Sequence, residues 1–327
     1  MSTARLVRQL ARPAIATALL LASTTHASLA SAQDVPVPPP SDPSGAAALP
    51  DPAAPGPYEI VSDEGVGVGF ESPINASDRP GNNALCEGFV QLFGTPAEQA
   101  REFAQIPAGM NMALYTLVRP KELREGQKYP ILTWGNGTCA LPRGYIGLLQ
   151  HLASHGFVVI AANSRFTGAG TPLLRGLDWL AKQNADPSSP LYQKLDLDRI
   201  GALGHSQGAG ATSIAGRDPR VKATALLNGG GSGGLRGPTF VLTGEQDISP
   251  AGARGAYNAA TVPAAFLNLK KSDHITLITE PARTNPAITA WFRYQLLGDE
   301  AGKAYFAGTA CKLCGSADWT YLQKNLK

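Results

Sequence analysis

The sequence GHSQG at residues 204–208 lies between an apolar run at 200–203 and a segment of small residues at 209–215. This context is typical of a nucleophile elbow, a sharp turn that joins a strand to a helix and presents a serine at the end of the strand. So tight a turn needs neighbours without bulk, which the glycines supply. We therefore predict Ser206 as a nucleophile, while an ordinary glycine-rich turn with a structural serine stays the alternative.

A serine hydroxyl must give its proton to a base, which is usually a histidine held by a carboxylate. Four of the five histidines lie in a predicted leader, in an amphipathic segment before the predicted strand 157–161, or beside the serine: His26, His151, His155 and His205. His274 follows the apolar run at 264–269, so a loop after a strand would carry it. We predict His274 as the base; a surface histidine is the alternative reading.

The acid is expected between the serine and the histidine in the chain order of one large class of serine hydrolases. The predicted strand at 239–243 is followed by Glu245 and Asp247. Asp247 is preferred because the acid must project from the loop beyond the strand, and Glu245 is the reserve.

The negative oxygen that forms on an attacked carbonyl needs two backbone N–H donors. One is expected from Gln207, which follows the nucleophile. The other is expected from Thr138, in the glycine-containing loop 135–139 after the predicted strand 129–134. A simple glycine turn would explain this loop equally well.

Short apolar runs alternate with segments of helical periodicity, which predicts a mostly parallel sheet with helices on both faces. The expected strands are 112–118, 129–134, 157–161, 200–203, 223–227, 239–243 and 264–269. The expected helices are 145–154, 173–183 and 287–297, the last with Trp291, Phe292 and Leu296 as packing residues.

Two longer segments, HLASHGFVVIAANSR at 151–165 and SSPLYQKLDLDRIGALGHSQGAGA at 188–211, add to the loops of Asp247 and His274. Over about residues 130–298 the chain resembles the secreted bacterial cutinase-like and PET-hydrolase-like polyesterases of the α/β-hydrolase superfamily, in its dienelactone-hydrolase and lipase branch. The resemblance implies the α/β-hydrolase fold. It also implies a Ser206, Asp247 and His274 triad, with Thr138 and Gln207 as oxyanion donors.

The chain departs from the PET-active members where they place aromatic rings against the substrate. The matching positions here are Thr138 and about Gly230, in the glycine-rich run 228–234. The substrate cleft is expected to be lined by Trp134, Asn136, His205 and Gly230. Without the two rings, aliphatic esters are expected to be better substrates than PET, unless Trp134 or Phe166 swings into the cleft.

Residues 1–32 are predicted to be a signal peptide, because three arginines precede an apolar stretch and a small-residue cleavage site. Residues 33–57, rich in Pro and Ala, are predicted to be a disordered linker, and 58–327 the catalytic domain. The chain has 28 basic and 25 acidic residues, so losing three arginines with the leader leaves 25 of each. A balanced charge disfavours a nucleic-acid partner. We expect a secreted monomer, extracellular or periplasmic, without stable membrane insertion.

Four cysteines in an exported chain predict disulfides, with three possible pairings. Cys311 and Cys314 could close a tight loop near the C-terminus, leaving Cys86 to meet Cys139. A thioredoxin-like role for this C-x-x-C is the alternative. No second Cys or His pair has zinc-ligand spacing, so no metal and no cofactor are expected.

These patterns predict a secreted serine hydrolase that cleaves carboxylic esters through an acyl-enzyme intermediate. Aliphatic polyesters, lipids and acylated polysaccharides stay open as substrate classes. A peptidase or amidase with the same triad is one alternative, and an inactive hydrolase fold that serves as a binding protein is another.

Overall fold

The computed structural model describes residues 49–67, 83–92, 96–106, 110 and 114–326. The predicted signal peptide and most of the predicted linker lie outside these residues, as do the first two residues of the expected strand 112–118.

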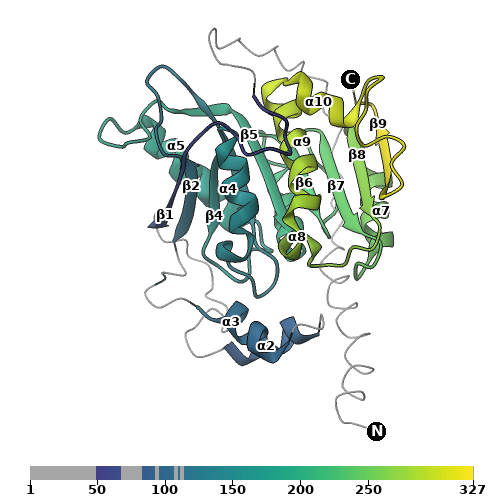
Figure 1. Ribbon diagram of the computed structural model, residues 1–327. Helices are drawn as coiled ribbons and strands as arrows, with labels where there is room; N and C mark the ends of the chain where they lie inside the picture. Colours follow the sequence, from purple (N-terminus) through teal and green to yellow (C-terminus); the bar gives the residue numbers. More distant parts are fainter. Residues whose placement is uncertain (1–48, 68–82, 93–95, 107–109, 111–113, 327) are drawn as a thin grey trace. The chain divides into compact units, whose positions relative to one another are not determined.

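A nine-stranded sheet forms the centre of the described chain, in the order β1-β2-β4-β3-β5-β6-β7-β8-β9 (Figure 1). The six strands from β4 to β8 in this order run parallel, and β1, β2 and β9 add to its two edges in antiparallel pairs. The strand bounds are β1 Ile60–Val66, β2 Tyr115–Pro120, β3 Tyr129–Gly135, β4 Val158–Ala162, β5 Leu195–His205, β6 Val221–Leu227, β7 Thr239–Gly244, β8 Ala264–Leu269 and β9 Trp319–Lys324.

Helices cover both faces of the sheet. The central strands β3, β4 and β7 are buried at every residue, since a parallel strand between two helical layers has no solvent-facing side. Helices α4 Ile146–Ser154 and α9 Asn285–Leu297 pack on one face, and α5 Thr171–Ala185, α6 Gln207–Ala215 and α7 Pro250–Ala259 on the other. This arrangement confirms the expected sheet with helices on both faces.

The expected helix at 287–297 is α9, and its three expected packing residues are buried. Trp291 and Phe292 are fully buried and Leu296 nearly so, all in one cluster with the α4 side of the core. The Trp291 indole satisfies its polar atom by donating to the carbonyl of Thr224 at 3.0 Å. These residues therefore stabilise the core.

Several elements were not expected from periodicity. They are β1, β9, α7 and the short helices α2 Asn83–Gln91, α3 Ala97–Ala104, η3 Pro142–Tyr145, α8 Thr276–Thr279, η4 Pro281–Arg283 and α10 Glu300–Phe306. The edge strands β1 and β9 are half-buried and carry polar residues, so they lack the continuous apolar run that identifies a central strand.

Contacts with the main body of the described chain begin before Tyr58, where the sequence analysis places the start of the predicted catalytic domain. Pro52 is buried, and its carbonyl meets His151 Nε2 at 2.9 Å, while that of Ala54 meets His155 Nε2 at 3.0 Å. A Cβ on Gly56 would lie 1.9 Å from a backbone oxygen, so only glycine fits there. Residues 52–56, within the predicted linker, therefore pack closely against α4 and His155.

Two disulfides are present, Cys86–Cys139 and Cys311–Cys314. The first joins residues 53 apart and the second residues 3 apart. Of the three pairings that the sequence leaves open, the structure therefore has the one with a local C-terminal bridge.

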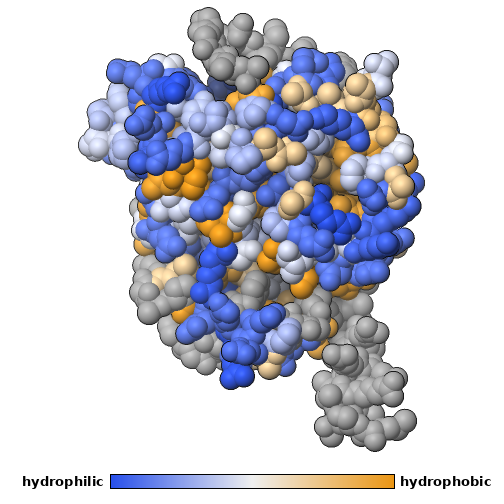
Figure 2. Space-filling view, viewed as in Figure 1, coloured by the Kyte–Doolittle hydropathy of each residue, from blue (hydrophilic) through white to orange (hydrophobic). Residues whose placement is uncertain are grey.

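The surface is mixed in polarity. Figure 2 shows hydrophilic residues over much of the face in view, with hydrophobic residues in separate patches among them. Within the described part of the chain, none of the helices has the length and apolar character needed to cross a membrane.

Candidate active site

Ser206 stands at the turn between β5 and α6, in a strained conformation. Its φ is +56° and its ψ −118°, a region that a non-glycine residue adopts only when the surroundings hold it there. A Cβ on Gly204 would lie 2.4 Å from the Gly208 carbonyl oxygen, and one on Gly208 would lie 2.0 Å from that of Gly135. The close approach of α6 to β3 therefore requires both glycines. The turn places Ser206 at the carboxyl end of β5.

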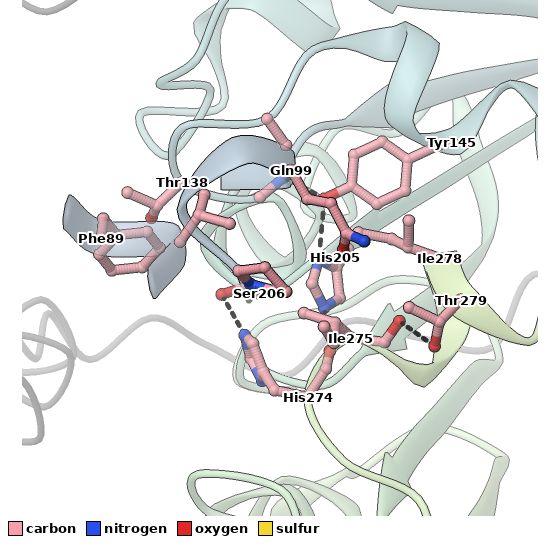
Figure 3. A pocket seen from close by; sticks show the side chains of 14 residues that line it. Phe89, Gln99, Thr138, Tyr145, His205, Ser206, His274, Ile275, Ile278 and Thr279 are labelled. Atoms are coloured by element: carbon pink, nitrogen blue, oxygen red, sulfur yellow. Dashed lines mark hydrogen bonds between the residues drawn. The ribbon is translucent and has the colours of Figure 1, made fainter. Parts of the chain in front are cut away.

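The three residues predicted as nucleophile, base and acid form one hydrogen-bonded chain, of which Figure 3 shows the bond between Ser206 and His274. Ser206 Oγ lies 2.9 Å from His274 Nε2, and His274 Nδ1 lies 2.6 Å from Asp247 Oδ1. The His274 and Asp247 side chains are only 8% and 3% exposed, so their interaction is shielded from water. The loops after β5, β7 and β8 bring them together.

Asp247 is held as a carboxylate by several donors. Its Oδ2 accepts from Asn228 and Thr243, each at 2.7 Å, and its Oδ1 also accepts from the Ile248 amide. Burial alone would raise the pKa of Asp247, but the hydrogen bonds from His274, Thr243 and Asn228 outweigh it, so the pKa lies below its usual value. The reserve acid Glu245 is exposed and accepts from the Lys271 amide instead.

His205 supports the loop of His274 through a network that the sequence did not reveal. Its Nε2 donates to the His274 carbonyl oxygen at 2.8 Å, because that oxygen can only accept. Its Nδ1 accepts from the Tyr145 hydroxyl at 2.9 Å, and that hydroxyl accepts from the Gly137 amide at 3.1 Å. Burial, with His274 nearby, lowers the pKa of His205 to about 3, so the ring is neutral and its tautomer is fixed.

Thr138 and Gln207, the two predicted oxyanion donors, contact each other through their side chains. The Gln207 amide nitrogen Nε2 donates to Thr138 Oγ1 at 3.3 Å, while its Oε1 accepts from the Gly168 backbone at 3.0 Å. The Gly137 N–H donates to the Tyr145 hydroxyl at 3.1 Å, and Thr138 follows Gly137 in this loop.

Two of the expected cleft residues, Trp134 and Asn136, are instead fully buried. Trp134 Nε1 donates to Asn136 Oδ1 at 2.8 Å, and the Asn136 amide donates to the carbonyls of Ala162 and Ser164. The prediction for their side chains was wrong, because Trp134 lies on β3 between two helical layers and the hydrogen bonds of Asn136 hold its side chain inside the protein. Trp134 packs against Tyr145 in the core, so it does not reach the substrate.

Gly230 lies outside the residues that line the cavity, whereas His205 is among them. Gly230 is exposed, with φ +80°, and a Cβ there would lie 2.8 Å from the Ala209 carbonyl oxygen on α6. Phe166, the second aromatic residue considered for the cleft, packs against the buried cluster of Cys86, Ala104 and Cys139. Neither the glycine-rich run around Gly230 nor Phe166 therefore places an aromatic ring in the cavity.

A cavity of about 360 Å³ opens in front of Ser206. On the side of the triad it is lined by His205, Ser206, His274, Ile275, Ile278 and Thr279. The oxyanion loop and η3 contribute Gly137, Thr138, Ala140 and Tyr145.

The opposite lining comes from a part of the chain that the sequence analysis did not link to the site. We call it the α2–α3 wall; it consists of Phe89, Val90, Pro96 and Gln99. In Figure 3, Phe89 and Thr138 lie to the left of Ser206, Gln99 lies above it toward Tyr145, and His274 lies below it. The one sequence signal for this wall was Cys86, whose partner Cys139 follows Thr138.

Comparisons with known proteins find matches over much of the chain. A sequence model of the PET hydrolase-like family matches residues 144–316, which include Ser206, Asp247 and His274. The chain is 30% identical over 225 residues to cutinase 2 of Thermobifida cellulosilytica, covering 62% of this chain and 79% of that protein. It is also 30% identical over 225 residues to cutinase cut1 of Thermobifida fusca, covering 65% of that protein. Cutinase est1 of Thermobifida alba is 28% identical over 183 residues, or 48% of this chain and 60% of the relative.

Proposed function

Since the chain belongs to the PET hydrolase-like family, we propose that it cleaves carboxylic esters with Ser206 as nucleophile, His274 as base and Asp247 as acid. The observation that carries this proposal is the hydrogen-bonded chain from Asp247 through His274 to a strained serine that faces a cavity. The cutinase relatives support an ester as the bond that is cleaved.

In the first step, Ser206 Oγ attacks the ester carbonyl carbon while its proton passes to His274 Nε2, 2.9 Å away. Asp247, ionised and fixed by Asn228 and Thr243, stabilises the resulting imidazolium. His274 then gives the proton to the departing alcohol, leaving an acyl group on Ser206. Water activated by His274 attacks this acyl-enzyme and releases the acid.

The negative charge that develops on the carbonyl oxygen is assigned to the backbone N–H groups of Thr138 and Gln207. The side-chain contact between these two residues holds the loop against the start of α6. The His205 and Tyr145 network fixes Gly137 on one side and the His274 carbonyl on the other, so it positions both the donor loop and the base.

Export is part of the proposal. A leader at 1–32 would carry the chain out of the cytoplasm, and two disulfides fit an oxidising compartment. We propose that the exported protein acts as a monomer on an ester substrate, without a cofactor.

Release of p-nitrophenol from p-nitrophenyl butyrate tests the proposal. A stoichiometric burst followed by slower turnover is expected for an acyl-enzyme. Both should be lost in Ser206→Ala and kept in Ser213→Ala, because Ser213 lies within α6 and bonds to Ala209 and Gly231 instead of the triad. Turnover of a matched anilide at the rate of the ester would instead favour the amidase reading, and unchanged release in Ser206→Ala would refute the assigned nucleophile.

A further inference from the structure

The α2–α3 wall belongs to a segment outside residues 144–316, the part matched by the family. It nevertheless lies on the cavity in front of Ser206, with Phe89 and Val90 from α2 and Pro96 and Gln99 from the start of α3. The volume of about 360 Å³ is at the lower end of the range of small-molecule sites. The wall therefore limits how large a group fits beside the serine.

The wall is attached to the hydrolase body at both of its helices. In α2, the buried Cys86 forms a disulfide with Cys139, the neighbour of Thr138 in the oxyanion loop. Phe89, one turn further along α2, packs on the cluster around this disulfide. The bond thus fixes the position of the Phe89 ring relative to the proposed oxyanion donor.

At α3, two arginines bind the end of the helix. The last carbonyls of a helix lack partners within it, and cationic side chains are favoured there. Arg143 Nη2 donates to the carbonyls of Glu102, at 2.6 Å, and Gln105, and Arg165 Nη2 donates to that of Ala104. Arg143 lies on η3 and Arg165 follows β4, so α3 is held by the same loops that frame the site.

The side of Ser206 that the wall occupies suggests which part of an ester it contacts. His274 must give its proton to the departing alcohol, so the alcohol lies on the His274 side of Ser206. Phe89 and Thr138 lie to the left of Ser206, away from His274 (Figure 3). The acyl group is left to extend toward Phe89, Val90 and Ala140, which are apolar.

We propose that the α2–α3 wall determines acyl size and limits the enzyme to compact apolar acyl groups. The proposal rests on the proposed ester hydrolysis at Ser206. Phe89 and Val90 are its specificity-determining residues, and the disulfide Cys86–Cys139 positions them. A polymer with bulky acyl units would have to displace the wall to reach the serine.

The test uses p-nitrophenyl acetate, butyrate and octanoate, which share one leaving group. The readout is the ratio of kcat/KM for octanoate to that for acetate, because a ratio from one preparation does not depend on the folded fraction. Phe89→Ala, which enlarges the cavity, should raise the ratio at least about tenfold, and Val90→Phe, which fills it, should lower the ratio about tenfold. Leu92→Ala, at a residue that is 41% exposed and outside the cavity lining, should leave the ratio within about twofold.

A second series, acetates of small and large alcohols, separates the two ends of the ester. We expect the ratio of kcat/KM for the acetate of a large alcohol to that of a small alcohol to stay constant in Phe89→Ala and Val90→Phe. Ratios that move with the alcohol and not with the acyl chain would overturn the acyl assignment. Octanoate-to-acetate ratios that stay constant in both variants, or that move in the same direction, would disprove the proposal that the wall determines acyl size. A wild-type protein without Ser206-dependent turnover would instead disprove the proposed function.

Discussion

The two sides of the cavity are built in different ways. The triad side is made of loops at the ends of parallel strands, where the sheet itself brings Ser206, Asp247 and His274 together. The α2–α3 wall depends on one disulfide and on two arginines that bind helix carbonyls. The comparison indicates that the chemistry of this enzyme belongs to its family fold, whereas the size of its substrate is set by an attached segment.

The largest expected effect concerns the triad side. Replacing Ser206, His274 or Asp247 by Ala should each lower kcat by about a thousandfold or more at unchanged folding, because the triad acts as a unit. Circular dichroism checks the fold and steady-state kinetics the rate. Glu245→Ala is the matched control, since its carboxylate contacts the Lys271 amide rather than His274. A near-normal rate in Asp247→Ala with a slow Glu245→Ala would reverse the choice of acid.

The second effect compares the two disulfides, only one of which holds the wall. The chain-entropy estimate gives about 4 kcal/mol for a bridge that spans 53 residues and about 2 kcal/mol for one that spans 3. Cys86→Ala with Cys139→Ala should therefore lower the free energy of unfolding more than Cys311→Ala with Cys314→Ala. Denaturant titration measures both.

The disulfide variants also address specificity. Only the Cys86 and Cys139 pair should raise the octanoate-to-acetate ratio, because only this bridge fixes Phe89. Equal ratios in the two double variants would mean that the arginines alone hold the wall.

A third, smaller effect concerns the network behind the base. Tyr145→Phe removes the hydroxyl that donates to His205 Nδ1 and accepts from Gly137. We expect kcat to fall about tenfold, since a buried acceptor left without a donor costs about 1 to 3 kcal/mol and loosens the loop of His274. The octanoate-to-acetate ratio should not change. A shifted ratio would show that the Tyr145 ring, which also lines the cavity, acts on substrate size.

A last effect, on stability alone, is the response to mild acid. His205, with its pKa lowered to about 3, and His155, with its pKa lowered to about 4, stay neutral in the folded protein where unfolded histidines take up protons. The unfolded state binds more protons, so the free energy of unfolding should decrease as pH falls from about 7 toward 5.

The decrease in the free energy of unfolding at low pH is not expected to depend on the α2–α3 wall. The described contacts of the α2–α3 wall are a disulfide and hydrogen bonds from arginines to backbone carbonyls, and none of them involves a histidine. The decrease between pH 7 and 5.5 should therefore be the same in the wild type and in the variant without Cys86 and Cys139. A decrease confined to the wild type would place the acid-sensitive contacts in the wall.

How much the sequence could predict also differs between the two sides. The strand expected at 264–269 is β8 to the residue, and the expected positions of Ser206, Asp247 and His274 relative to strands agree with the loops seen. Each of these signals is local: a buried run is followed by a polar residue. The fold needs only their order to bring them to one sheet edge.

The wall escaped prediction for physical reasons. Helices α2 and α3 are short, and their packing depends on Cys139, Arg143 and Arg165, which are 38 or more residues away in the chain. Trp134 illustrates the converse error. Its type suggested a substrate contact, but its position on a strand covered on both faces decided its burial.

The bridge between Cys86 and Cys139 also has a practical consequence for any preparation of the protein. A chain produced in a reducing cytoplasm would have the same triad and would cleave simple esters. Its acyl preference, however, would be that of a cavity whose α2–α3 wall lacks the Cys86–Cys139 bond. Assays on such material would report a broader substrate range than the oxidised enzyme has. The redox history of the sample thus becomes a variable of its specificity, to be fixed before any two measurements are compared.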